Sequence, residues 1–399
     1  MSKKHLPYWE FIVLVSIMFG MIAFGTDTML PAFPVIAQDL ELSNVNKAQL
    51  IVSSFILGTG LGQLISGPVS DTFGRKPIIT IGLLIFILAC IGAYYIESLE
   101  LMLVARFIQG LGISAPRTVT MALIRDLYSG RKMAQVMSLA MAIFVLVPAL
   151  APSIGQLLSI NFGWRSIYIA FIAFALIGLL WLNLRQPETL LFNQRKKLRP
   201  IEFISAFKIV ITNTAVVKYT ITLALGFGAL FGYLNSAQQI FVDTLGAGIR
   251  FPIYFAIISI LAAPASFMNA ALVMKYGMRL LTITGFALQI IFAIVTLIIL
   301  NQPSIPVEWL LITFILWSVI AFFLKGLYFG NLNALAMEPM GEIAGMASAI
   351  IGASATMLGI LIAIPIGLAF NGSAVPVLFG YITCSCLALI LMLTKSTKS

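Results

Sequence analysis

Twelve long apolar runs, separated by short polar connections, dominate the sequence and constrain its fold more than any other feature. A helix of about 20 apolar residues spans a hydrocarbon core of roughly 30 Å. Apolar residues make up 60% of the chain and charged residues 10%, a balance that no water-facing globular surface tolerates. The sequence therefore predicts an all-α membrane protein with little chain left for a soluble domain. The runs cover residues 11–30, 48–69, 78–96, 101–123, 133–158, 164–184, 216–242, 252–274, 280–300, 307–332, 344–370 and 375–393.

The runs divide into six and six, on either side of the most basic stretch of the chain. We expect a six-helix bundle over residues 1–184, a basic cytoplasmic linker over 185–215, and a second six-helix bundle over 216–399. Within the linker, residues 201–211 are predicted to form a helix on the membrane surface. The order aromatic, Gly, then basic occurs at 73–75 and, with one residue inserted, at 276–279. This similarity between the two halves favours two pseudo-symmetric repeats.

Basic residues are concentrated in the connections that share one side of the membrane with both termini. The opposite connections hold only Lys47, Arg165 and Arg250. By the positive-inside rule both termini are cytoplasmic, and the net charge of +10 reflects topology rather than nucleic-acid binding. The basic residues on the predicted cytoplasmic side are Lys3, Lys4, Arg75, Lys76, Arg125, Arg131, Lys132, Arg185, Arg195, Lys196, Lys197, Arg199, Lys208, Lys218, Lys275, Arg279, Lys395 and Lys398.

The sequence gives no sign of a metal site, a cofactor or an enzymatic centre. Cys90, Cys384 and Cys386 lie inside apolar runs without metal-ligand spacing, and His5 is the single histidine. No paired carboxylates, His cluster or Ser/Lys arrangement occurs at catalytic spacing. We therefore expect a transporter rather than an enzyme. A membrane sensor would need a signalling domain, for which no stretch is long enough.

Four ionisable residues fall well inside the apolar runs: Asp27, Arg106, Arg117 and Lys325. Charges at such depth are costly unless they face a partner or a watery cavity, so they mark a functional site. Helical rise places Asp27 about 24 Å from the cytoplasmic start of its run and Arg106 about 8 Å from the outer start of its own. Both would lie in the outer leaflet. They either pair and separate as a proton or solute intervenes, or form a permanent ion pair.

Arg117 and Lys325 lie at comparable depths in comparable runs of the two halves. Three cations against one carboxylate favour an anionic, zwitterionic or neutral polar solute. Alternatively, Arg117 or Lys325 extends to the cytoplasmic interface. Gln63, Tyr233 and Asn235 are candidates to line the same cavity, although hydrogen bonding between helices explains them as well.

Proline and glycine mark places where the predicted helices bend or touch. Pro148, Pro152 and Gly155 interrupt the fifth run, and Gly58 and Gly62 form a GxxxG pair in the second. Close packing explains most of these residues. Kinks in such helices also serve as bending points during alternating access.

Four segments resemble motifs of a known family. Residues 67–76 read GPVSDTFGRK, 106–112 read RFIQGLG, 148–155 read PALAPSIG and 27–31 read DTMLP. Together they resemble the major facilitator superfamily and, within it, the drug:proton antiporters of the bicyclomycin-resistance (Bcr/CflA) type. The resemblance covers essentially the whole chain. Ala151 stands where a glycine usually precedes the proline of the antiporter motif.

The resemblance implies roles for several of these residues. Asp71, Gly74, Arg75, Arg125 and Asp126 would form a cytoplasmic gate that stabilises the outward-facing state. Asp27 and Arg106 would act in proton coupling or solute binding, and Pro148, Pro152 and Gly155 in gating. Arg117 and Lys325 lie outside the motifs.

The expected protein is a monomeric, multi-pass transporter of the bacterial inner membrane. It exchanges protons for small drug-like or amphipathic solutes by alternating access. The alternative is a transporter of an anionic or zwitterionic metabolite or a siderophore-like solute. Its partners are then the solute, protons and the lipid bilayer, without nucleic acid.

Overall fold

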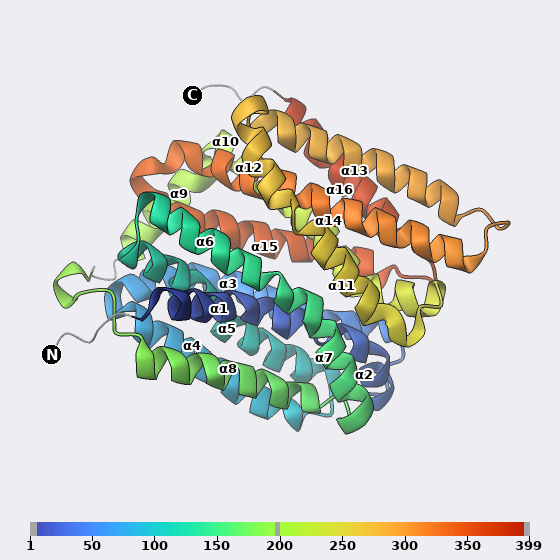
Figure 1. Ribbon diagram of the computed structural model, residues 1–399, viewed down its shortest axis with the longest axis horizontal. Helices are drawn as coiled ribbons and strands as arrows, with labels where there is room; N and C mark the ends of the chain where they lie inside the picture. The colour runs from blue at the N-terminus through green and yellow to red at the C-terminus, as the bar shows by residue number, and fades with distance from the viewer. Residues whose placement is uncertain (1–5, 196–199, 395–399) are drawn as a thin grey trace. The chain divides into compact units, whose positions relative to one another are not determined.

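The structure, a computed structural model, describes residues 6–195 and 200–394, and within them it contains helices and connections (Figure 1). Twelve helical segments of this described part are long and apolar enough to cross a membrane. The predicted all-α fold with twelve spanning helices is therefore confirmed. Some residues of the predicted basic linker and termini lie outside the described residues, namely Lys3, Lys4, His5, Lys196, Lys197, Arg199, Lys395 and Lys398.

The chain divides into two compact units, of which the first comprises Met1–Ser43 and Ser54–Phe203. In this unit α1 is the central helix and packs against α5, α6, α7 and α8, while α4 packs against α5 and α8. The helices of the unit are α1 (Tyr8–Asp27), α2 (Phe33–Asp39), α3 (Leu50–Phe73), α4 (Arg75–Tyr94), α5 (Leu99–Leu127), α6 (Gly130–Phe144), α7 (Leu146–Phe162) and α8 (Ser166–Arg185), with the short helix η1 (Leu30–Ala32) after α1.

The second unit comprises Asn44–Ser53 and Ile204–Ser399. Here α10 packs against α14, α15 and α16, and α13 packs against α14 and α16. The helix predicted at 201–211 is present as α9. The remaining elements are η2 (Val45–Gln49), α9 (Pro200–Thr212), α10 (Thr214–Gln239), η4 (Ile240–Thr244), η5 (Gly248–Arg250), α11 (Phe251–Ala262), α12 (Ala265–Tyr276), α13 (Met278–Leu300), α14 (Val307–Met337), η6 (Glu338–Ile343), α15 (Ala344–Leu368) and α16 (Val375–Leu393).

Two of the predicted apolar runs, the fifth and the eighth, are broken by a proline inside the run. The fifth run is interrupted at Val145, between α6 and α7, because the ring of Pro148 excludes the helical carbonyl of Phe144 four residues earlier. Pro152 lies inside α7, which continues through it. The eighth run is likewise broken between α11 and α12, at Pro264. Hydropathy alone does not reveal this second break, because proline interrupts an apolar run without making it polar.

Glycines bring the helices of the first unit into backbone contact. A Cβ atom on Gly58 of α3 would overlap the carbonyl oxygen of Phe107 of α5, and one on Gly110 would overlap the carbonyl oxygen of Phe55. A Cβ on Gly155 of α7 would overlap the carbonyl oxygen of Thr28. These contacts hold α3 and α7 against the segments that carry Arg106 and Asp27.

Large apolar side chains cover the outer faces of both units. Examples are Leu88 on α4, Ile160 on α7 and Phe267 on α12, with 67%, 67% and 66% of their surface exposed. Such exposure is unfavourable in water and favourable in lipid. The solvent of these faces is therefore the bilayer.

Candidate functional site

The carboxyl end of α1 carries a buried carboxylate. Asp27 is the last residue of α1 and has 5% of its surface exposed. Its Oδ1 accepts a hydrogen bond from Thr26 Oγ1 at 3.0 Å. The chain then turns through Thr28 into η1, where Pro31 prevents α1 from continuing. Asp27 thus lies where a spanning helix is interrupted within the protein interior.

Arg106 of α5 is fully buried and contacts the same end of α1. Its guanidinium donates to the carbonyl oxygen of Gly25 at 2.7 Å and to Gln109 Oε1 at 2.8 Å. The ring centroid of Phe55 lies 4.4 Å from its Cζ. The structure therefore brings Arg106 to the backbone two residues before Asp27. The pairing of the two side chains stays a prediction.

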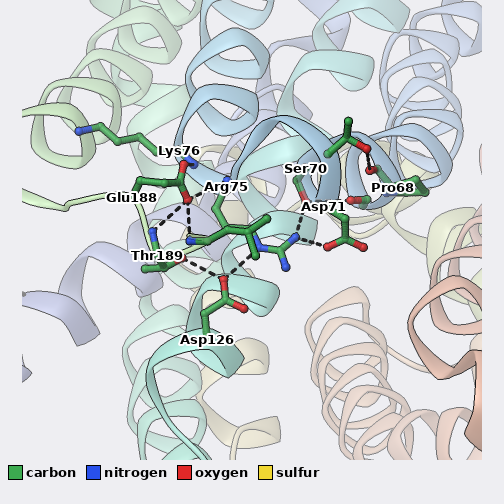
Figure 2. Close-up of polar contacts among 11 residues, drawn as sticks. Pro68, Ser70, Asp71, Arg75, Lys76, Asp126, Glu188 and Thr189 are labelled. Carbon is green, nitrogen blue, oxygen red and sulfur yellow. Dashed lines mark hydrogen bonds and ion pairs between the residues drawn. The ribbon is translucent and has the colours of Figure 1, made fainter. Parts of the chain in front are cut away.

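A second group of charged residues joins the ends of α3, α4 and α5, and Figure 2 shows it around the guanidinium of Arg75. Arg75 donates to Asp126 Oδ2 at 3.0 Å, to Ser70 Oγ at 2.8 Å and to the carboxylate of Asp71. The residue itself has 7% of its surface exposed. We call Asp71, Arg75, Asp126 and Glu188 the Arg75 cluster. The buried guanidinium of Arg75 is thus paired with two carboxylates. A buried cation needs such partners, because an unpaired charge is costly in the protein interior.

Glu188 also belongs to this cluster, although no motif or charge pattern in the sequence points to it. Its two carboxylate oxygens each accept a hydrogen bond at 3.0 Å, from the backbone N–H groups of Arg75 and Lys76 (Figure 2). These are the first two residues of α4, so the carboxylate caps the positive end of the helix. Gly74 precedes them at φ +108°, and a Cβ there would lie 2.6 Å from Glu188 Oε2. The glycine of the motif is needed for both reasons.

We expect Glu188→Gln to lower the free energy of unfolding by about 1 to 2 kcal/mol. The glutamine keeps one acceptor oxygen but turns an NH2 group toward a backbone N–H and removes the charge at the helix end. Thermal unfolding of purified protein in detergent measures the change. Glu97→Gln, on an exposed side chain between α4 and α5, is the matched control. Equal unfolding midpoints for the two variants would contradict the capping role.

Three predicted site residues lie apart from these clusters. Arg125, adjacent to Asp126, is exposed at the end of α5. Arg117 is also exposed on α5, whereas Arg106 on the same helix is fully buried. Gln63 of α3 is half-buried. Their predicted roles in gating and solute binding stay predictions.

In the second unit, Lys325 and Tyr233 are brought together. Lys325 of α14 has 5% of its surface exposed, and Tyr233 of α10 has none. The Nζ atom of Lys325 lies 5.9 Å from the ring centroid of Tyr233 and 3.8 Å from that of Phe322. The two residues that the sequence singled out separately therefore share one aromatic environment.

Asn235 takes part in a different contact, to residues 44–53, which belong to the second unit. Its Nδ2 donates to Ser53 Oγ at 3.1 Å. Nearby, Gln49 Nε2 donates to Gln239 Oε1 at 2.6 Å, and Gln239 Nε2 donates to Asn46 Oδ1 at 2.9 Å. Asn46 Nδ2 in turn donates to the carbonyl oxygen of Phe370 at 2.8 Å. We call Asn46, Gln49 and Gln239 the glutamine relay.

The glutamine relay was not anticipated, because its members are ordinary polar residues near the ends of apolar runs. We expect Gln239→Leu to lower the free energy of unfolding by about 2 to 4 kcal/mol, since it leaves a buried donor on Gln49 and a buried acceptor on Asn46 without partners. Thermal unfolding in detergent measures this, with Gln302→Leu at an exposed loop position as the control. A midpoint for Gln239→Leu no lower than that of the control would contradict the prediction.

The described residues contain no group of three or more His, Cys, Asp or Glu side chains that could hold a metal ion.

The profile of the Major Facilitator Superfamily matches residues 15–364 of the chain. The chain belongs to this superfamily. Among curated proteins, the bicyclomycin resistance protein homolog of Haemophilus influenzae is 28% identical, and the match covers 98% of this chain and 97% of that protein. The multidrug resistance protein MdtL of Escherichia coli is 27% identical, with 92% and 91% covered. The resemblance to the bicyclomycin-resistance type is thus confirmed.

Solved structures agree with the facilitator fold. The chain resembles a D-xylose–proton symporter with a TM-score of 0.76 and 16% identity, covering 96% of this chain and 97% of the other. The xylose transporter XylE of Escherichia coli gives a TM-score of 0.72 at 15% identity, with 97% and 98% covered. As a facilitator, the chain is a multi-pass membrane protein that transports a small molecule.

Proposed function

We propose that this facilitator exports small, drug-like or amphipathic solutes in exchange for protons. The observation that carries the proposal is the buried carboxylate of Asp27, at the interrupted end of α1 and close to the backbone that Arg106 binds. Relatives named for resistance to bicyclomycin, chloramphenicol and several drugs support export as the direction.

In the proposed cycle, Asp27 takes up a proton from the outer side, which weakens its attraction to Arg106. Arg106 keeps its position when this happens, because the carbonyl of Gly25 and the side chain of Gln109 still accept its hydrogen bonds. Release of the proton to the inside is coupled to the outward step of the solute. A proton is thus exchanged for a solute through one carboxylate.

Gating is assigned to the Arg75 cluster and to the break between α6 and α7. The Arg75 cluster, together with Gly74, stabilises the outward-facing state, and the Pro148 break with Pro152 and Gly155 lets the span of α6 and α7 bend.

The setting proposed for the chain is the bacterial inner membrane, as a monomer with both termini in the cytoplasm. The concentration of basic residues in the connections on one side supports this orientation. It places the Arg75 cluster on the cytoplasmic side.

Expression in a bacterium deprived of its own efflux pumps tests the proposal. We expect raised resistance to bicyclomycin, chloramphenicol or both, and no rise for a variant with Asp27→Asn. If resistance to every compound of a broad panel stays unchanged while a labelled metabolite is taken up, drug export is wrong.

A further inference from the structure

The second unit contains a buried lysine whose charge is not balanced within that unit. Lys325 lies in the middle part of α14, and its buried Nζ atom has no hydrogen-bond partner among the described residues. The ring centroids of Phe322, Tyr381 and Tyr233 lie 3.8, 5.3 and 5.9 Å from that atom. The rings come from α14, α16 and α10 and attract the cation through their faces. They offer it no acceptor of a strong hydrogen bond.

The surrounding side chains also carry hydrogen-bond donors without partners. The hydroxyl group of Tyr381 and the Nε1 of Trp317 are buried and have no partner in the described part of the chain. The ring centroids of Trp317 and Tyr381 lie 4.9 Å apart, and those of Trp317 and Tyr233 lie 6.0 Å apart. We call Tyr233, Trp317, Phe322, Lys325 and Tyr381 the Lys325 cluster. Buried polar groups are rarely left unpaired in folded proteins, so these donors point to a group that accepts their hydrogen bonds.

The acceptor does not come from an acidic residue of the second unit. Between residues 204 and 394 the acidic residues are Asp243, Glu308, Glu338 and Glu342. Asp243 lies in η4, Glu308 in the first turn of α14, and the other two in η6, all at the ends of spans. Among the described residues 204–394, no acidic residue therefore lies in the middle of a span.

We propose that the Lys325 cluster is a solute subsite that takes the acidic group of an aromatic or amphipathic organic anion. Lys325 and the free hydroxyl and indole donors bind the anionic oxygens, and the aromatic faces contact the planar apolar part of the solute. This inference rests on the proposed function and narrows its solute class. A cationic solute is disfavoured, because the ammonium group of Lys325 repels it.

The aromatic rings of the Lys325 cluster pack against one another edge to face. Trp317 and Tyr381 meet edge to face with an interplanar angle of 71°, and Tyr233 and Phe322 at 69°. Side chains packed in this way lose little further freedom on binding a flat ligand. The subsite therefore discriminates by charge and shape together.

Binding of radiolabelled 1-naphthaleneacetate to the full chain in lipid nanodiscs tests the subsite, with binding to empty discs subtracted. The competitors are unlabelled 1-naphthaleneacetate, its neutral amide, and 2-(1-naphthyl)ethylammonium. We expect the acid to bind about tenfold or more tighter than the amide, and the ammonium compound to bind most weakly.

Variants connect this preference to Lys325. Lys325→Met removes the charge and the donors while keeping the length of the side chain, and should equalise the acid and the amide. Lys325→Arg should keep the acid preferred. Lys275→Met, at an exposed position on α12, should match the unchanged protein. Lys325→Met should also raise the thermal unfolding midpoint, because it removes a buried charge that the second unit leaves unbalanced.

Equal affinity for the acid and the amide, no binding of either, or a preference that survives Lys325→Met would overturn the subsite. The result is separate from the test of drug export, because binding needs no proton gradient. An acid preference without drug resistance would leave the subsite standing and refute export. Drug resistance without an acid preference would refute the subsite and leave drug export standing.

Discussion

Replacing Asp27 with asparagine is expected to abolish transport driven by a pH gradient while leaving solute binding in place. Asparagine has the shape of aspartate, and its carbonyl oxygen can still accept the hydrogen bond from Thr26. It cannot bind and release a proton. In vesicles with an imposed pH gradient, transport by the variant should fall to the level of vesicles without the protein.

The matched control for this variant is Asp39→Asn, because Asp39 ends the same helical segment, Tyr8–Asp39. Asp39 pairs with Arg165 and accepts a hydrogen bond from Trp164, and 42% of its side chain is exposed. Gradient-driven transport by this variant should persist. Undiminished gradient-driven transport by Asp27→Asn would rule out the proton role of Asp27.

A single methyl group at Gly58 is expected to cause a large loss of stability. The Cβ of Gly58→Ala would overlap the carbonyl oxygen of Phe107, and neither atom can rotate away, because the helix backbones fix both positions. Separating α3 from α5 should cost about 3 kcal/mol of unfolding free energy. The thermal unfolding midpoint in detergent and the yield of monodisperse protein report the loss.

Gly67→Ala on the same helix should behave in the opposite way. Its Cβ would lie 3.9 Å from Thr118 Cγ2, an ordinary contact. Because alanine favours a helix more than glycine does, this variant should be unchanged or more stable by up to about 1 kcal/mol. Similar midpoints for the two alanine variants would show that α3 and α5 are not held together by backbone contact at Gly58.

Much of the fold follows from the sequence, because a bilayer imposes one length and one polarity on every span. The twelve apolar runs correspond to the twelve spans, and the break before Pro148 follows from the geometry of proline. The contact of Arg75 with Asp71 is also local, since the two residues are four positions apart, on either side of the junction between α3 and α4.

Other features depend on residues that are far apart in the chain. Glu188 caps α4 from 113 residues away, and nothing near Glu188 in sequence distinguishes it from another polar linker residue. The glutamine relay joins Gln49 to Gln239 across 190 residues. The sequence points to Tyr233 and Lys325 as separate candidates. Only the packing of α10, α14 and α16 places the two residues beside Trp317 and Tyr381. Sequence periodicity places a residue on a helix; it does not say which helix lies opposite.

One physical constraint links the Asp27, Arg75 and Lys325 regions: a charge buried in the protein interior needs an oppositely charged or hydrogen-bonding partner. Arg75 has two carboxylates and Arg106 has backbone and amide oxygens. Asp27 and Lys325 are the buried charges for which a proton and a solute are the proposed partners.

Accumulation of a labelled drug in proteoliposomes tests proton antiport most directly. The drug should be the one to which expression gives the greatest resistance, and the sign of the imposed pH gradient decides the outcome. Antiport predicts that an acidic lumen drives accumulation above the external concentration, since protons leave as the drug enters. Accumulation driven by an alkaline lumen, or accumulation that does not change with the sign of the pH gradient, would contradict proton antiport.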